Sequence, residues 1–145
     1  MTVLDQQRIR QLIPHAGRMC LLETVEHWDA GSVRCTSRSH LDPQNPLRGA
    51  HGMQALHLVE YAAQATAVHG GLRAAPDAKP APGMLVSLRG VTLAVPMLDG
   101  IAAPLLIEAR LKLADAAGWL YEFSVSAEGT QLAAGRLMVM TATSD

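Results

Sequence analysis

The sequence HLVEYAAQATAVHGG, residues 57–71, decides the fold, because it predicts a long helix with few polar positions. The segment 53–69 contains no proline or glycine and is rich in alanine, a composition that favours a helix. Gly70 and Gly71 predict the end of this helix. A helix that is apolar on nearly every side is buried in its protein, so Glu60 in its middle requires an explanation.

A short helix and two irregular segments are predicted around this central helix. Residues 5–13, DQQRIRQLI, have apolar residues at helical spacing, with Asp5 as the N-cap and Pro14 as the end. Residues 40–52 contain prolines, glycines and other turn residues, which predict a loop. Residues 73–83 are rich in proline and alanine and predict a flexible connection rather than a domain boundary.

The remaining segments predict strands. Apolar and polar residues alternate along 105–113 and 119–128, which is typical of half-buried antiparallel strands. A turn signal, DAG at residues 29–31, separates the predicted strands 20–28 and 32–39. The predicted strands are residues 20–28, 32–39, 84–95, 105–113, 119–128 and 131–142.

These elements predict an α+β fold in a single domain, residues 1–145. One antiparallel sheet of about six strands must cover its apolar face, and only one long helix is present to do so. The sheet is therefore expected to wrap around the central helix, whose alanines permit close approach. This arrangement leaves sheet edges and part of the helix uncovered in one chain, which predicts a dimer.

Composition excludes several functional classes. The formal charge is −1 and no basic run occurs, which argues against nucleic acid as a partner. No apolar segment reaches transmembrane length and no signal region is visible, so a cytoplasmic protein with no membrane contact is expected. Cys20 and Cys35 are too few for a disulfide framework. The histidines lack metal-ligand spacing, so we expect no metal and no cofactor.

Three segments together resemble the β-hydroxyacyl–acyl-carrier-protein dehydratases, which have the hot-dog fold. IRQLIPHAGRMCLLETV (9–25) resembles their opening, VEYAAQA (59–65) their central-helix motif, and LRGVTLAVPMLDG (88–100) their third strand. The match is closest to the dehydratase-like branch found in aryl-polyene pigment clusters, where NPLR (45–48) also has a similar counterpart. The resemblance implies dehydration of β-hydroxyacyl thioesters on acyl-carrier protein, in fatty-acid or polyene synthesis.

Such a reaction needs an acid, a base and a polarised thioester carbonyl. The resemblance implies that Glu60 is the acid, with apolar surroundings favouring its protonated form, and that Gln64 orients it from one turn further along the same face. The backbone N–H groups of Gly52 and Met53, at the start of the predicted helix, are expected to bind the thioester carbonyl. The alternative for Glu60 is a glutamate held by Gln64 or by a partner chain for structure alone.

The base is the point of departure from the family. The dehydratases carry a loop histidine some fourteen residues ahead of the acid, and Pro46 holds that register here. His51, beside the start of the helix, is the favoured replacement, and His40 is the alternative. Either is otherwise a solvated loop histidine. The other histidines, interpreted as structural or without a chemical neighbour, are His15, His27, His57 and His69.

Three functions remain open. The first is a dehydratase with Glu60 as acid and His51 as base. The second is an acyl-thioesterase in which Glu60 activates water. The third is a non-catalytic or partly catalytic hot-dog subunit that binds acyl-carrier protein beside a catalytic chain. The Glu60–Gln64 pair favours the first and the absent loop histidine favours the third. The expected partners are an acyl-carrier protein or coenzyme A thioester and, in a homodimer or heterodimer, a second hot-dog chain.

Overall fold

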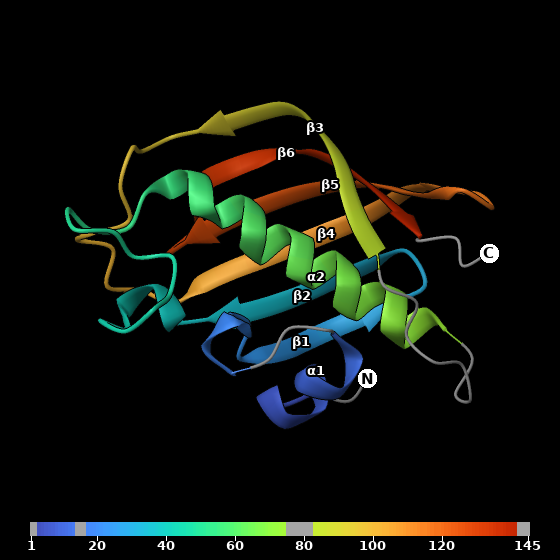
Figure 1. Cartoon of the computed structure of the whole chain (residues 1–145), viewed down its shortest axis with the longest axis horizontal. Coiled ribbons are helices and arrows are strands. Elements are labelled where there is room, and N and C mark those ends of the chain that lie inside the picture. The colour runs from blue at the N-terminus through green and yellow to red at the C-terminus, as the bar shows by residue number, and fades with distance from the viewer. Residues whose placement is uncertain (1–2, 14–16, 75–82, 142–145) are drawn as a thin grey trace.

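A computed structural model describes residues 3–13, 17–74 and 83–141 and has the predicted α+β architecture (Figure 1). All strands pair antiparallel in one six-stranded sheet of order β1-β2-β4-β5-β6-β3. The α-helices are α1 (Gln6–Leu12) and α2 (Leu58–Arg73). The strands are β1 (Thr24–Asp29), β2 (Ser32–Ser37), β3 (Gly83–Leu93), β4 (Leu105–Ala114), β5 (Gly118–Ala127) and β6 (Thr130–Thr141).

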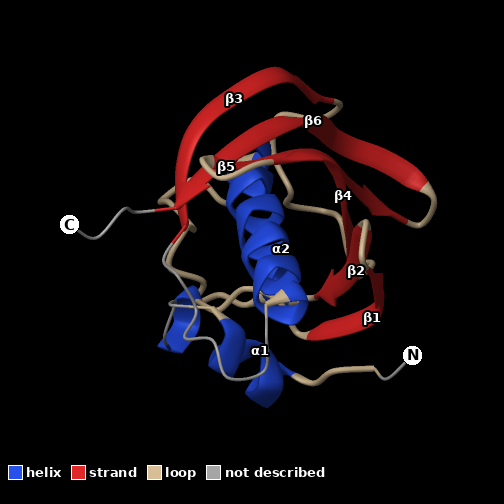
Figure 2. Cartoon of the chain, turned by 90° about the vertical axis from the view of Figure 1, so that its right-hand side faces the viewer, coloured by secondary structure: helices blue, strands red, loops and turns tan. Residues whose placement is uncertain are grey.

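The sheet curves around α2 as predicted, so that the helix fills the inner face of the arc (Figure 2). Most of α2 is buried, including Leu58, Ala62, Ala65 and Val68, each fully inaccessible. The alternating strands turn their apolar residues towards it, and burial along β5 follows the period of two. The small side chains on the helix allow the sheet to approach it from several directions. The sheet wrapped around one helix confirms the hot-dog architecture expected from the sequence.

The predicted limits of the central helix were wrong at both ends. Met53 is not helical, and its carbonyl accepts from the Leu98 N–H at 2.8 Å. A 3₁₀ turn, Ala55–His57, then leads into α2. At the other end the helix continues through Gly71, where an added Cβ would lie 3.1 Å from the Leu12 side chain. This glycine therefore permits close packing of α1 and does not end the helix.

Strand β1 begins four residues later than predicted, at Thr24. In the segment before it, the Glu23 N–H donates to the Thr36 carbonyl of β2 at 2.9 Å, and side chains bond the residues further back. The Gln6 amide donates to the Leu22 carbonyl at 2.9 Å, and the Ser37 hydroxyl donates to the Leu21 carbonyl at 2.5 Å. The other strand limits agree with prediction to within two residues, and Asp5 caps α1 by accepting from the Arg8 N–H at 3.0 Å.

Strand β3 forms one edge of the sheet and leaves apolar surface uncovered. Leu88 pairs with Leu137 and Leu93 pairs with Ala133, so both leucines belong to the inner face. They are nevertheless 42% and 40% exposed, because α2 does not extend over this part of the sheet. The inner face beside β3 therefore carries apolar side chains that this chain alone does not bury.

The sequence also led to expectations about the cysteines, membrane-spanning helices and metal-binding side chains. Cys20 and Cys35 are both buried and free, and burial raises the pKa of the Cys35 thiol to about 12. No helix among the described residues is both long and apolar enough to cross a membrane. Over the same residues, no group of three or more His, Cys, Asp or Glu side chains is placed to hold a metal ion. The predicted end of the first helix at Pro14 lies outside the described residues, as does His15.

Candidate active site

Glu60 lies in the first turn of α2 and is half-buried. Its neighbour Tyr61 fixes this turn to the loop that precedes the helix. The Tyr61 hydroxyl lies 2.7 Å from the Ser39 hydroxyl and accepts from the Asn45 amide at 3.2 Å. Because Tyr61 is fully buried and bonded on both sides, the carboxyl-bearing turn has a defined place in the fold.

Gln64 does not line an open site. It is fully inaccessible, its amide oxygen accepts from the Leu21 N–H at 2.9 Å, and its amide nitrogen donates to the Met19 carbonyl at 2.5 Å. These bonds satisfy backbone groups of Met19 and Leu21 in the segment that leads into β1. The sequence did not reveal these partners of the Gln64 amide, and the substrate-binding role of Gln64 stays a prediction.

The backbone N–H groups predicted to bind the thioester carbonyl are both engaged within the chain. The Gly52 N–H donates to the Gly49 carbonyl at 3.2 Å. The Met53 N–H donates to the Asp99 carboxylate at 3.0 Å. The prediction placed these residues at the start of the helix, whereas both precede it. Gly52 pairs with Gly49, and Met53 bonds to Leu98 and Asp99 in the segment that follows β3. Thioester binding at Met53 would require Asp99 to release this hydrogen bond.

Asp99 and Arg48 meet beside the predicted base, and sequence reasoning missed this contact. The Asp99 carboxylate also accepts from the Arg48 guanidinium at 3.0 Å, and Arg48 donates to the His40 carbonyl at 2.7 Å. The Met53 N–H, first, and then Arg48 lower the pKa of Asp99. Both residues stood within motifs quoted for the family resemblance, NPLR and PMLDG, but neither motif revealed that they meet.

His51, the predicted base, is exposed at the tip of a tight turn. The turn is closed by the Gly49 N–H donating to the Gly52 carbonyl at 2.9 Å, together with the reverse bond described above. His57, by contrast, is half-buried and ends the 3₁₀ turn before α2. The structure thus places His51 on a loop beside the entrance to the helix rather than on a rigid element.

His40, the alternative base, is buried and not a solvated loop histidine. Its Nε2 lies 2.9 Å from the Ile101 carbonyl, and since a carbonyl only accepts, Nε2 carries the proton. Nδ1 is buried without a hydrogen-bond partner within the described ranges, and so is the Arg48 Nε. Burial lowers the pKa of His40, which favours the neutral ring.

His69 and His27 have structural partners away from Glu60. His69 lies with Nδ1 2.7 Å from the Tyr121 hydroxyl and Nε2 2.8 Å from the Asp29 carbonyl, so both ring nitrogens are used in the core. Burial lowers the pKa of His69 and raises that of Tyr121 to about 12. His27 is exposed on β1, 3.7 Å from the Asp29 carboxylate.

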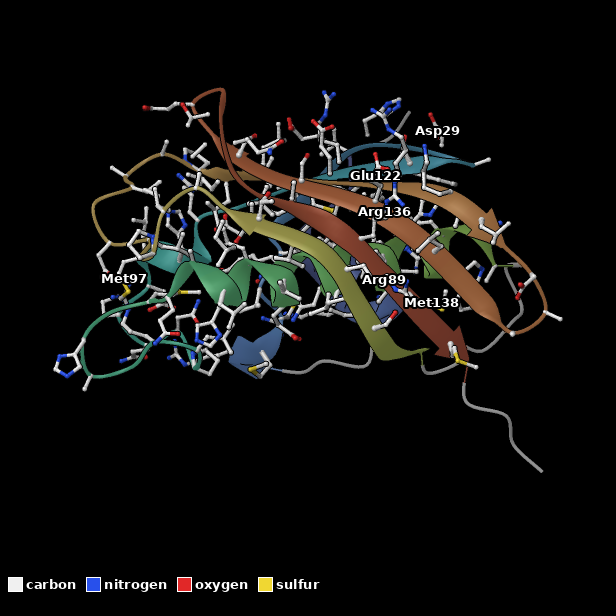
Figure 3. The ribbon with its side chains drawn as sticks, turned by 90° about the horizontal axis from the view of Figure 1, so that it is seen from above. Asp29, Arg89, Met97, Glu122, Arg136 and Met138 are labelled. Atoms are coloured by element: carbon white, nitrogen blue, oxygen red, sulfur yellow. The ribbon has the colours of Figure 1, made fainter. Side chains whose placement is uncertain are left out.

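A hollow of about 800 Å³ lies on the outer face of the sheet, turned away from α2. Cross-strand ion pairs line it, Arg34 with Glu108 at 3.4 Å and Arg136 with Glu122 at 3.7 Å. Figure 3 shows Glu122 and Arg136 side by side, with Arg89 next to them. Because Glu60 belongs to the helix on the inner face, this hollow is separate from the candidate active site.

A six-stranded antiparallel sheet wrapped around one central helix, with a half-buried glutamate in the first turn of that helix, defines a hot-dog protein with a candidate acid. A family described as ApeP-like, ApeP dehydratase, matches residues 7–145. The chain belongs to this ApeP-like dehydratase family, which confirms the resemblance seen in the sequence.

Solved structures agree with this assignment. The dehydratase heterocomplex ApeI:P from Xenorhabdus doucetiae contains a chain 28% identical, with a TM-score of 0.79 over 93% of this chain and 91% of that one. A variant of thioesterase PA1618 from Pseudomonas aeruginosa is 11% identical, with a TM-score of 0.65 over 95% of each chain. An HP0420 homologue from Helicobacter felis is also 11% identical, with a TM-score of 0.67 over 96% and 88%. The last two show the fold alone. No curated protein sequence matches significantly.

Proposed function

We propose that this chain is a cytoplasmic dehydratase subunit that acts on β-hydroxyacyl thioesters held on an acyl-carrier protein. The observation that carries the proposal is the position of Glu60, a carboxyl group in the first turn of the central helix of an ApeP-like dehydratase family member. In the reaction a base removes the proton next to the thioester carbonyl. Glu60 donates a proton to the β-hydroxyl, the C–O bond breaks, water leaves and a double bond forms.

His51 is the base in this proposal. A base must come within about 3 Å of the atom that carries its proton, so the exposed turn must close over a substrate beside Glu60, in the same or the partner chain. The turn is short and flanked by Gly49 and Gly52, and Gly52 already has a φ of 111°, a conformation open mainly to glycine.

A second hot-dog chain completes the proposed unit. Leu88 and Leu93 leave the inner face uncovered beside β3, and an exposed sheet edge with apolar residues is a surface that proteins cover. The similar chain from Xenorhabdus doucetiae belongs to a complex of two kinds of chain. We therefore propose that β3 faces either a second copy or a different hot-dog subunit.

A second candidate function is a partner subunit that supports catalysis in another chain. Two observations favour it, namely Pro46 at the register of the family's loop histidine and the exposure of His51. The thioesterase alternative rests on likeness of fold alone, because the thioesterases that match are 8–11% identical.

The test is turnover of a 3-hydroxyacyl carrier-protein thioester by the purified chain, measured as enoyl product and as free thiol. A dehydratase forms enoyl thioester and releases no thiol, and a histidine-free turn, His51→Ala, abolishes this activity. Product that appears only with a second hot-dog subunit supports the partner function. Thiol release without an enoyl product contradicts both. The same acyl group on coenzyme A, used as a parallel substrate, identifies the carrier.

A further inference from the structure

The entrance to α2 is assembled from two loops that are distant in sequence. The turn 49–52 and Met53 come from the loop before the helix, and Asp99 comes from the loop after β3. The Gln54 and Met97 backbones pair as an isolated bridge between these loops. Figure 3 shows Met97 at the end of the molecule where the two loops meet. The place of the proposed base therefore depends on contacts between the loops.

Asp99 makes the charged contacts between these segments. One carboxylate oxygen accepts from the Met53 N–H at 3.0 Å, and the other accepts from Arg48 at 3.0 Å. Arg48 in turn donates to the His40 carbonyl at 2.7 Å. Hydrogen bonds to an ionised group are the stronger kind, and here a single carboxylate is bonded on both sides of the turn that carries His51.

Gly52 is matched to this carboxylate. A Cβ at this position would lie 2.2 Å from an Asp99 carboxylate oxygen, and the Gly52 φ is +111°. Any other residue would therefore displace the Asp99 side chain in addition to straining its own backbone. The absence of a side chain at Gly52 is what lets Asp99 reach the Met53 N–H.

We infer that Asp99 is a positioning residue for the proposed dehydration. It does not touch the reacting atoms. Through Met53 and Arg48 it fixes the turn 49–52, and with it the path of His51 towards the substrate beside Glu60. This inference rests on the proposed function.

A merely structural carboxylate would change stability and leave the catalytic step alone, whereas a positioning residue changes kcat because a small misplacement of a catalytic group slows the reaction strongly. We expect Asp99→Ala to lower kcat about tenfold or more with little change in KM. Asp99→Asn keeps one oxygen to accept from Met53 and loses the charge that attracts Arg48. It should restore part of the lost kcat.

Asp115 provides the matched control. Its carboxylate accepts from the Ala117 N–H at 2.8 Å and the Gly118 N–H at 3.1 Å in the turn between β4 and β5. Like Asp99 it accepts from a backbone N–H, but its partners lie in its own turn and not in the segment that carries His51. Asp115→Ala should leave kcat unchanged. An equal loss of kcat in both variants would overturn the inference.

Amide hydrogen exchange of the intact chain separates this inference from the proposed function. In Asp99→Ala the Met53 amide should exchange at least tenfold faster than in the wild type, and Asp99→Asn should be intermediate, whether or not the chain turns over substrate. Unchanged protection of Met53 overturns the inference. Faster turnover in Asp99→Ala also overturns it, because the carboxylate would then block the Met53 N–H rather than position the turn. If the wild-type chain shows no dehydratase activity but the variants show the expected exchange pattern, only the proposed function is contradicted.

Discussion

The two ends of α2 differ in how fully their buried polar groups are satisfied. At the carboxyl end, His69 uses both ring nitrogens, one with Tyr121 and one with the Asp29 carbonyl. At the amino end, His40 uses Nε2 with the Ile101 carbonyl, while its buried Nδ1 has no partner among the described residues. Arg48 likewise leaves its buried Nε without one in that part of the chain.

This difference in hydrogen bonding predicts different roles for the two ends of α2. Buried polar groups are nearly always hydrogen-bonded, and each exception in a native protein calls for an explanation. Proteins tend to leave buried polar groups without hydrogen bonds at functional sites. The carboxyl end therefore stabilises the core, and the amino end, with Glu60 in the adjoining turn, is where chemistry is expected. The following predictions test that division, from the largest effect to the smallest.

Glu60→Gln should lower dehydration by about 10²-fold or more, the scale of a positioned acid–base group. Size and polarity are nearly unchanged, so the free energy of unfolding should stay close to that of the wild type. Steady-state turnover together with urea denaturation measures both. Glu26→Gln is the control, because Glu26 is an exposed carboxylate on β1. Unchanged turnover in Glu60→Gln would remove Glu60 from the mechanism.

Gly52→Ala should destabilise the amino end by roughly 1–3 kcal/mol, because alanine must adopt a positive φ there. Its Cβ would also collide with the Asp99 carboxylate. The free energy of unfolding from urea titration measures the cost. Gly129→Ala is the matched control, since Gly129 has a φ of +78° with nothing near the added Cβ. Equal losses in both variants would show that backbone strain alone matters and that Asp99 does not.

Tyr121→Phe should destabilise the carboxyl end by about 1–2 kcal/mol, the usual cost of leaving a buried polar group without its partner. The His69 Nδ1 would lose the hydroxyl 2.7 Å away. Turnover per folded molecule should not change, because this end takes no part in the reaction. A loss of kcat in this variant, measured with the same substrate, would contradict the division between the two ends.

Acid should weaken the fold modestly through the buried histidines. Burial, the largest cause, lowers the pKa of both His40 and His69 below the ordinary value. The unfolded chain then binds these protons first, so the free energy of unfolding falls as the pH drops below about 6.5. Above that pH these two groups contribute no slope.

The measurement is urea denaturation between about pH 5.5 and 7.5. His69→Gln removes one titrating ring and should reduce the slope in this range. A slope that His69→Gln does not alter would contradict the prediction.

Periodicity was enough to predict the architecture, because the alternation of 105–113 and 119–128 and the alanine-rich helix are local signals. The helix limits failed for tertiary reasons. Gly71 resembled a helix stop, yet its lack of a side chain serves the packing of Leu12. Met53 resembled the start of a helix, yet it pairs with residues more than forty positions later, such as Leu98. Contacts of that range leave no mark on a local pattern.

The candidate site was predictable only where a residue's role follows from its own helix. Glu60 was singled out because a carboxyl group is unusual on a buried helix. Gln64 was placed on the right helix, but its partners, Met19 and Leu21, come from a segment whose missing strand bonds the sequence did not show. The contacts of Asp99 were missed because they depend on the space left at Gly52, a relation between two loops.

The buried thiol of Cys35 makes the chain a reporter of its own opening. With a pKa of about 12 in the folded protein, only about one thiol in ten thousand is the reactive thiolate at pH 8. In the unfolded chain the ordinary pKa of about 8.5 makes a substantial fraction reactive. Alkylation of Cys35 should therefore proceed only through open molecules. When closing is fast relative to alkylation, its rate reads the population of open molecules directly in native buffer.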